Sequence, residues 1–458
     1  MKLRNLAAAA VLLLSTAVSA HAADKIKIEM WHGLSGDLGD AVGEVCSRFN
    51  ASQNDFEIAC TSQGSYDAAL QNTIAAYRAG KAPTIVQVFD AGTLDMMLSN
   101  AFVPAHDLMS KNGYTIDWSK YVSSISDYYA NSKGELYSFP FNSSSALFYW
   151  NKDAFAKIGM TEAPKTWEEV QTAAEKMKAA GIDCPLALND DTWALMEQFD
   201  AIHSQPTATL DNGYGGLGAE MQINKNKFVD YATYLKTNLD RGLFKLRLPA
   251  GGSTIVQSFA KGECMMMMTS VADHGTVGRT QVEGLHFGTA MLPVYAGTKR
   301  LNSLVGGASL WTLKGHSDAE YKAAAAFLNF IGQPESELFW STRTGYIPVT
   351  KTGFAFLESK GFYKDPKYAG REIALASLTA SPVDPHFSRG NRLGGFVQIR
   401  KEIRDALNNI YNNTDVAKAA DPAKATRALV QSELDNAVAR SNDILRRFEK
   451  TYAGRQLP

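Results

Sequence analysis

A glycine pair followed by an arginine is the stretch of this chain whose chemistry is easiest to interpret. Gly394-Gly395 precedes an apolar pattern over 399–410 that has the spacing of one helix face, so Arg400 lies about one turn into the helix. A lone cation is unfavourable there, because the free N–H groups already make a helix N-terminus positive. An anion bound between these amides and the guanidinium would reverse that balance. The plainer alternative is that Arg400 and Arg404 share a solvated helix face.

The elements that must position such a site alternate between strands and helices. Residues 25–30 alternate polar and apolar side chains and lead through the glycine-containing segment 31–39 into a helical pattern. Residues 83–89 form a nearly continuous apolar run, which is typical of a strand covered on both faces. This alternation predicts an α/β fold, in which ligands bind at the carboxyl ends of strands. The residues at or just beyond such ends are Trp31, His32, Tyr66 and Asp90.

The first 22 residues have the pattern of an export signal. Lys2 and Arg4 supply a basic start, 6–18 an apolar core, and Ala20-His21-Ala22 a cleavage site, so we expect the mature chain to begin near residue 23. No later run approaches the roughly 18 apolar residues of a membrane span. We therefore expect a soluble protein outside the cytoplasm.

Composition and charge narrow the function classes. The 458 residues are 45% hydrophobic and 20% charged, which is ordinary for a globular protein of two or three domains. Without Lys2 and Arg4 the formal charge is 44 − 47, or −3, so the mature chain lacks the basic footprint of a nucleic-acid binder.

Four cysteines remain after the signal segment, and an oxidising compartment permits disulfides among them. Spacing alone leaves three pairings open. We favour Cys46–Cys60, which joins a helix to the next strand, and Cys184–Cys264, which ties two segments of one domain. The alternative is four buried free thiols.

Known catalytic patterns are missing from the sequence. It contains no His-Glu-x-x-His, Gly-x-Ser-x-Gly or Walker-A motif, and its eight histidines show no metal-ligand spacing. The methionine run 265–268 reads as a buried strand rather than a soft-metal site. The glycines of 33–39 do not match the dinucleotide fingerprint and predict a loop beside the ligand site expected at the strand ends. We expect a protein without enzymatic activity, cofactor or metal.

Short motifs run in order along the mature chain and carry a family resemblance. They are Trp31-His32, Gln87 to Thr93, Pro140 to Ser144, Tyr149 to Asp153, Lys165-Thr166-Trp167, Gly306 to Trp311, Thr344 to Pro348, Arg392-Leu393-Gly394 and Gln398-Ile399-Arg400. Together they resemble the extracellular solute-binding proteins of ABC importers, the family typified by maltose-binding protein, and within it the glycerol-phosphate branch. The resemblance implies two α/β lobes joined by hinge crossings, with a ligand cleft between them. Lobe one would comprise 23–142 and 290–338, and lobe two 143–289 and 339–458.

The resemblance also implies a set of cleft residues. In the family pattern a glutamate stands where this chain has Asp90, so we expect its hydrogen bond to a ligand hydroxyl to be displaced or water-mediated. Arg400 would give a bidentate pair to phosphate, and the serines, tyrosines and the Gly307 amide would donate single hydrogen bonds. The implied set is Tyr66, Asp90, Ser144, Trp193, Ser270, Gly307, Tyr346 and Arg400.

The implied function is that of a monomeric periplasmic receptor. It would bind sn-glycerol 3-phosphate or a glycerophosphodiester such as glycerophosphocholine and deliver it to an inner-membrane ABC permease, with no nucleic-acid partner. A sugar or oligosaccharide receptor is the alternative within the same class, because aromatic side chains stack on sugar rings. An exported phosphodiesterase is the alternative from another class.

Overall fold

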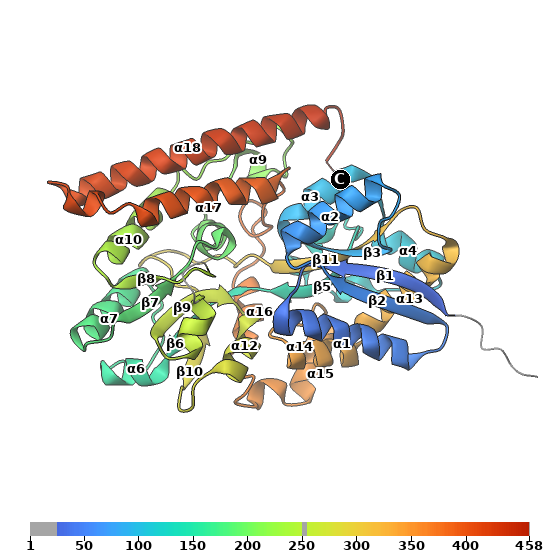
Figure 1. Cartoon of the computed structure of the whole chain (residues 1–458), viewed down its shortest axis with the longest axis horizontal. Coiled ribbons are helices and arrows are strands. Elements are labelled where there is room, and N and C mark those ends of the chain that lie inside the picture. Colours follow the sequence, from blue (N-terminus) through green and yellow to red (C-terminus); the bar gives the residue numbers. More distant parts are fainter. Residues whose placement is uncertain (1–24, 250–253, 458) are drawn as a thin grey trace, which may run out of the picture.

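Two β-sheets, lying side by side, organise the molecule (Figure 1). The computed structural model describes residues 25–249 and 254–457, so the expected signal segment lies outside it. The first sheet has the strand order β2-β1-β3-β11-β4, and β5 also pairs with β11. Its strands are β1 (Ile26–His32), β2 (Phe56–Ser62), β3 (Ile85–Phe89), β4 (Phe102–Val103), β5 (Phe139–Ser144) and β11 (Gly306–Leu313).

The second sheet has the order β10-β6-β9-β7-β8 and mixes both strand directions. β7 pairs in parallel with β8 and β9, whereas β6 runs antiparallel to β9 and β10. The methionine run lies in β9, which confirms that it is a core strand. The strands are β6 (Ala146–Asn151), β7 (Cys184–Leu188), β8 (Phe244–Leu246), β9 (Cys264–Ser270) and β10 (Phe287–Ala290).

Helices cover both sheets, and the expected α/β alternation is confirmed. Around the first sheet lie α1 (Gly36–Ser52), α2 (Tyr66–Arg78), α3 (Thr93–Ser99), α4 (Ala105–Lys111), α5 (Ser123–Tyr129), α13 (Asp318–Ile331), α14 (Pro334–Arg343) and α15 (Lys351–Ser359). Around the second lie α6 (Lys152–Lys157), α7 (Trp167–Ala179), η3 (Trp193–Glu197), α8 (Gln198–Ile202), α9 (Thr209–Asn212), α10 (Phe228–Asp240), α11 (Ile255–Ala260), α12 (Asp273–Thr280), α16 (Glu372–Leu378), α17 (Phe396–Asn412) and α18 (Pro422–Thr451). None of the helices in the described ranges combines the length and the apolarity needed to cross a membrane.

The two favoured disulfides are both present. Cys46 of α1 is bonded to Cys60 of β2, and Cys184 of β7 is bonded to Cys264 of the neighbouring strand β9. Each bond therefore links elements that already pack against each other on one sheet, and no cysteine is left as a free thiol.

The expected lobe boundaries fall at specific places in this architecture. The boundary between residues 142 and 143 lies inside β5, and the one between 338 and 339 lies inside α14. The boundary between 289 and 290 lies at the end of β10. Because β5 pairs with β11 and α14 packs on α1, both interrupted elements contact the first sheet or its helices.

Candidate functional site

All eight residues implied by the family resemblance line one cavity of about 730 Å³ between the two sheets. Strand ends supply Ser144 of β5, Ser270 of β9 and Gly307 of β11, and Asp90 directly follows β3. A second cavity of equal volume lies beside α1 and contains none of the eight. The other members are Tyr66, Trp193, Tyr346 and Arg400.

A buried chain of hydrogen bonds fixes Tyr66. Gln87 accepts from the Gly33 amide at 2.9 Å and donates to Asn142 Oδ1 at 2.8 Å. Asn142 Nδ2 donates to the Tyr66 hydroxyl at 2.8 Å, and the Tyr66 ring stacks on Phe89 with centroids 5.2 Å apart. The side chains of Gln87 and Asn142 thus fix the position of the Tyr66 hydroxyl. Because the hydroxyl oxygen accepts from Asn142, its own O–H is left to donate.

Tyr346 reaches the same place from the loop after α14. Its hydroxyl lies 3.5 Å from that of Tyr66, and its ring stacks on Trp340. Burial raises the pKa of both tyrosines, so both hydroxyls keep their protons at neutral pH. Two protonated phenols side by side are suitable donors to an anionic oxygen.

Two adjacent glycines of β11 shape the cavity wall. Gly307 has φ +103°, and a Cβ there would overlap the Asn142 carbonyl oxygen, so any other residue would push β11 away from β5. A Cβ on Gly306 would overlap the Trp193 ring. Because Gly306 has no side chain, the Trp193 indole can lie against the first sheet. Trp193 itself belongs to the second-sheet side.

Three helices begin at the cavity. Tyr66 is the first residue of α2, Asp273 the first of α12, and Gln398 lies in the first turn of α17, and all three line the cavity. The N-cap residues of α12 and α17, Ala272 and Gly395, have no side chain that caps the first-turn amides. These N–H groups and the helix dipoles favour an anion without needing a basic patch.

Arg400 has partners that the sequence did not reveal. Its Nε donates to Glu197 Oε1 at 2.7 Å and its Nη2 to Glu197 Oε2 at 2.9 Å, and Nη2 also forms an ion pair with Asp90 Oδ2. All three side chains are buried. Carboxylates thus occupy the Nε and Nη2 atoms of Arg400, and the expected bidentate pair from Arg400 to phosphate stays a prediction that this arrangement does not favour.

Acidic groups outnumber basic ones along the cavity. Its lining contains five carboxylates, Asp67, Asp90, Asp191, Asp273 and Asp405, and three cations, Arg400, Lys401 and Arg404. Burial raises the pKa of the Asp273 carboxyl to about 6 and also raises that of Asp191. The field of the whole cavity does not attract anions, so local donors have to hold any phosphate.

Arg392 lies outside the cavity. Its amide donates to the Asn212 carbonyl at 2.9 Å, its Nη2 donates to the Tyr128 carbonyl at 3.2 Å, and its guanidinium lies over the Tyr214 ring at 4.8 Å. These contacts give it a structural role in anchoring the segment before α17. Sequence reasoning missed Glu197, Asn142 and Gln87, although the last two lie within motifs of the family resemblance.

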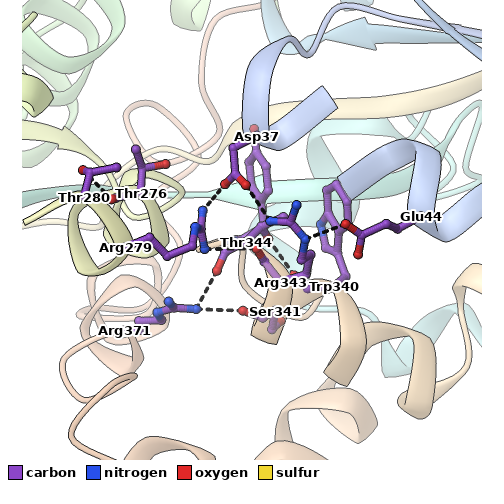
Figure 2. Close-up of polar contacts among 11 residues, drawn as sticks. Asp37, Glu44, Thr276, Arg279, Thr280, Trp340, Ser341, Arg343, Thr344 and Arg371 are labelled. Carbon is purple, nitrogen blue, oxygen red and sulfur yellow. Dashed lines mark hydrogen bonds and ion pairs between the residues drawn. The ribbon is translucent and has the colours of Figure 1, made fainter. Parts of the chain in front are cut away.

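Ion pairs connect helices beside the cavity (Figure 2). Asp37 of α1 pairs with Arg279 of α12 and, at 2.7 Å, with Arg343 of α14. Arg343 also contacts Glu44 at 2.9 Å. Because α1 covers the first sheet and α12 the second, the Asp37–Arg279 pair spans the two halves. Leu34 and Leu38, on either side of Asp37 in sequence, line the cavity.

Known proteins match this chain over most of its length. The family model described as bacterial extracellular solute-binding protein matches residues 44–370. The sn-glycerol-3-phosphate-binding periplasmic protein UgpB of Escherichia coli K12 is 35% identical over 448 residues, which is 97% of this chain and 98% of the relative. Among solved structures, UgpB from Mycobacterium tuberculosis in complex with glycerophosphocholine has a TM-score of 0.69 at 20% identity, covering 91% of this chain and 99% of that one.

A solved sugar-binding protein shares the same fold. MalE from Xanthomonas citri has a TM-score of 0.68 at 17% identity, covering 94% of this chain and all of that one. At such low identities the solved structures establish only the two-lobed fold. Family membership rests on the family match and on the Escherichia coli relative. The chain belongs to the bacterial extracellular solute-binding protein family.

Proposed function

We propose that this protein is a periplasmic receptor for sn-glycerol 3-phosphate or a glycerophosphodiester and that it delivers its ligand to an ABC permease. The observation that carries the proposal is the convergence of Tyr66, Ser144, Ser270, Gly307 and Tyr346 on one cavity that the Arg400–Asp90 pair also lines. We assign ligand contacts to all eight cavity residues named above. The curated relative named for binding glycerol 3-phosphate supports the ligand class.

The phosphate is placed among neutral donors. Two hydroxyls of serine, two of tyrosine and a backbone amide supply single hydrogen bonds, and the N-termini of α2 and α12 add their dipoles. A phosphodiester fits this arrangement as well as a monoester, because no cation in it demands a second negative charge. The diester's second substituent would point toward the open part of the cavity.

The glycerol end is placed at Arg400 and Asp90. An adjacent carboxylate and guanidinium accept from and donate to the same hydroxyl, whereas a phosphate oxygen there would face Asp90. The flat Trp193 ring offers an apolar surface to the glycerol carbons. This assignment replaces the expectation that Arg400 holds the phosphate.

Closure of the two lobes would bury the ligand. We propose the division 23–142 with 290–338 and 143–289 with 339–458, with a monomer presenting both lobes to the permease and no catalytic step. Contacts available only in the closed form would supply the free energy of closure.

Isothermal titration calorimetry with glycerol 3-phosphate, glycerophosphocholine and maltose tests the function. We expect binding of at least one phosphate ester and none of maltose. Tight maltose binding without phosphate-ester binding would establish the sugar receptor instead, an alternative favoured by the Arg400–Asp90 pair and the Trp193 ring. Release of glycerol from a diester would establish an enzyme.

A further inference from the structure

We propose that Glu197 is a positioning and specificity-determining residue, which orients Arg400 and, together with Asp90, makes that end of the cavity reject anionic groups. The inference rests on the proposed function, because it specifies which end groups a glycerol phosphate ester is allowed to carry.

The geometry shows how Glu197 acts through Arg400. Glu197 is 2% exposed and lies behind the cavity rather than in its lining. Both of its oxygens engage the guanidinium, at 2.7 Å from Nε and 2.9 Å from Nη2, which is the bidentate arrangement that fixes a guanidinium in its plane. Asn391 Nδ2 donates to Glu197 Oε2 at 3.3 Å and holds the carboxylate from the other side. A monodentate partner would leave the guanidinium free to rotate toward a ligand anion.

Two polar atoms without a partner in the described part of the protein determine which ligand groups can bind at this end of the cavity. Among the described residues, neither Arg400 Nη1 nor Asp90 Oδ1 has a hydrogen-bond partner in the protein. One is a donor and the other an acceptor, and both belong to residues that line the cavity. A hydroxyl satisfies both, whereas a carboxylate or a phosphate satisfies only the donor.

The net charge of this cluster also favours a hydroxyl over an anionic group. One guanidinium faces the two carboxylates Asp90 and Glu197, so the cluster carries one excess negative charge. Asp191, which is half-buried and interacts electrostatically with Arg400, adds to this excess, and Arg404 partly offsets it. Because Arg400, Asp90 and Glu197 are buried, such an excess repels an incoming anion strongly.

Two ligands that differ only at this end provide the test. 3-Phosphoglycerate is glycerol 3-phosphate with the terminal hydroxymethyl group replaced by a carboxylate. We expect wild-type protein to bind glycerol 3-phosphate at least about 100-fold more tightly in calorimetry. In Glu197→Gln the cluster becomes neutral at nearly unchanged shape, so we expect this preference to shrink about tenfold or more.

Matched variants separate charge from packing. Glu197→Asp keeps the charge but shortens the reach, so both affinities are expected to fall while their ratio stays high. Glu337→Gln makes the same carboxyl-to-amide change in another buried side chain, one in α14 outside the lining of this cavity, and is expected to leave both affinities unchanged. Asp90→Asn removes the other negative charge of the cluster and is expected to shrink the preference as Glu197→Gln does, even where the latter folds poorly.

The outcomes distinguish this inference from the proposed function. Absence of binding of every glycerol phosphate ester to the wild-type protein would overturn both. Binding of glycerol 3-phosphate and 3-phosphoglycerate with equal affinity would overturn the inference alone, as would a preference that neither Glu197→Gln nor Asp90→Asn reduces.

Discussion

Arg279 of α12 and Asp37 of α1 form an ion pair between helices that cover different sheets (Figure 2). Asp37 is held from its other oxygen by Arg343, at 2.7 Å, so the carboxylate is oriented before Arg279 reaches it. The pair lies beside the cavity and is one-third exposed on both sides. It therefore contributes to holding the two halves together only to the modest extent of a solvated ion pair.

Replacing Arg279 by glutamine should weaken ligand binding slightly. Loss of a partly exposed ion pair costs at most about 1 kcal/mol, which corresponds to an affinity two- to fivefold lower. The loss should diminish at high salt, because salt screens the pair in the wild-type protein. Calorimetry at low and high ionic strength measures it. Arg427→Gln, which breaks an ion pair with Asp230 far from the cavity, is the control. Equal affinity of Arg279→Gln and wild type at low salt would contradict the prediction.

Replacing Arg400 by alanine should impair both binding and folding. Removing a buried, hydrogen-bonded cation costs about 2–5 kcal/mol in ligand affinity. It also leaves Asp90 and Glu197 without their cation, which costs the fold about 3–5 kcal/mol. Arg404→Ala, which changes another cationic cavity residue without a described ion pair, should unfold like the wild type.

The stability loss of Arg400→Ala should depend on pH. Burial already raises the pKa of Glu197, and the Coulombic and hydrogen-bonding contributions of Arg400 oppose this. Without Arg400 the folded-state pKa rises further, so the folded variant takes up protons as the pH falls. Its unfolding free energy should therefore recover toward the wild-type value between pH 8 and pH 5. Urea denaturation at these two pH values measures the recovery, and an equal deficit at both would contradict it.

Gly306→Ala should displace Trp193. A Cβ at this position would overlap the half-buried indole, so the ring would have to move. We expect overpacking of about 1–3 kcal/mol, seen as a ten- to hundredfold loss of affinity and a shift in tryptophan fluorescence. Gly278→Ala in α12 has open space around its Cβ and should bind like the wild type. Unchanged affinity of Gly306→Ala would show that Trp193 does not contact the ligand.

Glu337 should make stability fall as the pH rises. Burial raises its pKa from 4.5 to about 8, although Thr350 donates to its Oε2 at 3.0 Å. Between pH 5 and pH 8 the folded protein keeps a proton that the unfolded chain has lost, so the unfolding free energy decreases over this range and levels off above it.

Glu337→Gln should remove this decrease. Because the amide does not ionise, the variant should gain about 4 kcal/mol relative to wild type between pH 5 and pH 8.5. Urea denaturation across this range measures the gain. Glu283→Gln, which changes an exposed carboxylate, should follow the wild-type curve. A Glu337→Gln profile parallel to that of the wild type would contradict the assignment.

The sequence by itself determined the α/β alternation, and its family resemblance supplied eight of the residues that line the cavity. Periodicity reports whether a strand is covered on one face or both, so the run 83–89 and the methionine run were recognisable as core strands. Tyr66 and Asp90 follow predicted strands and Arg400 lies near the start of a helical pattern, so local pattern alone singled them out. The other five residues came from the family resemblance.

Only the tertiary structure decided what these residues contact. Arg400 and Glu197 are 203 positions apart, and Asp37 and Arg279 are 242 apart. No local pattern encodes such pairs, because they depend on how two sheets and their helices come together. Glu197 lies in a helical segment whose neighbouring residues have the pattern of ordinary core, and it meets Arg400 only because α17, which lines the cavity, packs against this segment. The same packing turns Arg400 from an expected phosphate ligand into the centre of a carboxylate-bound cluster.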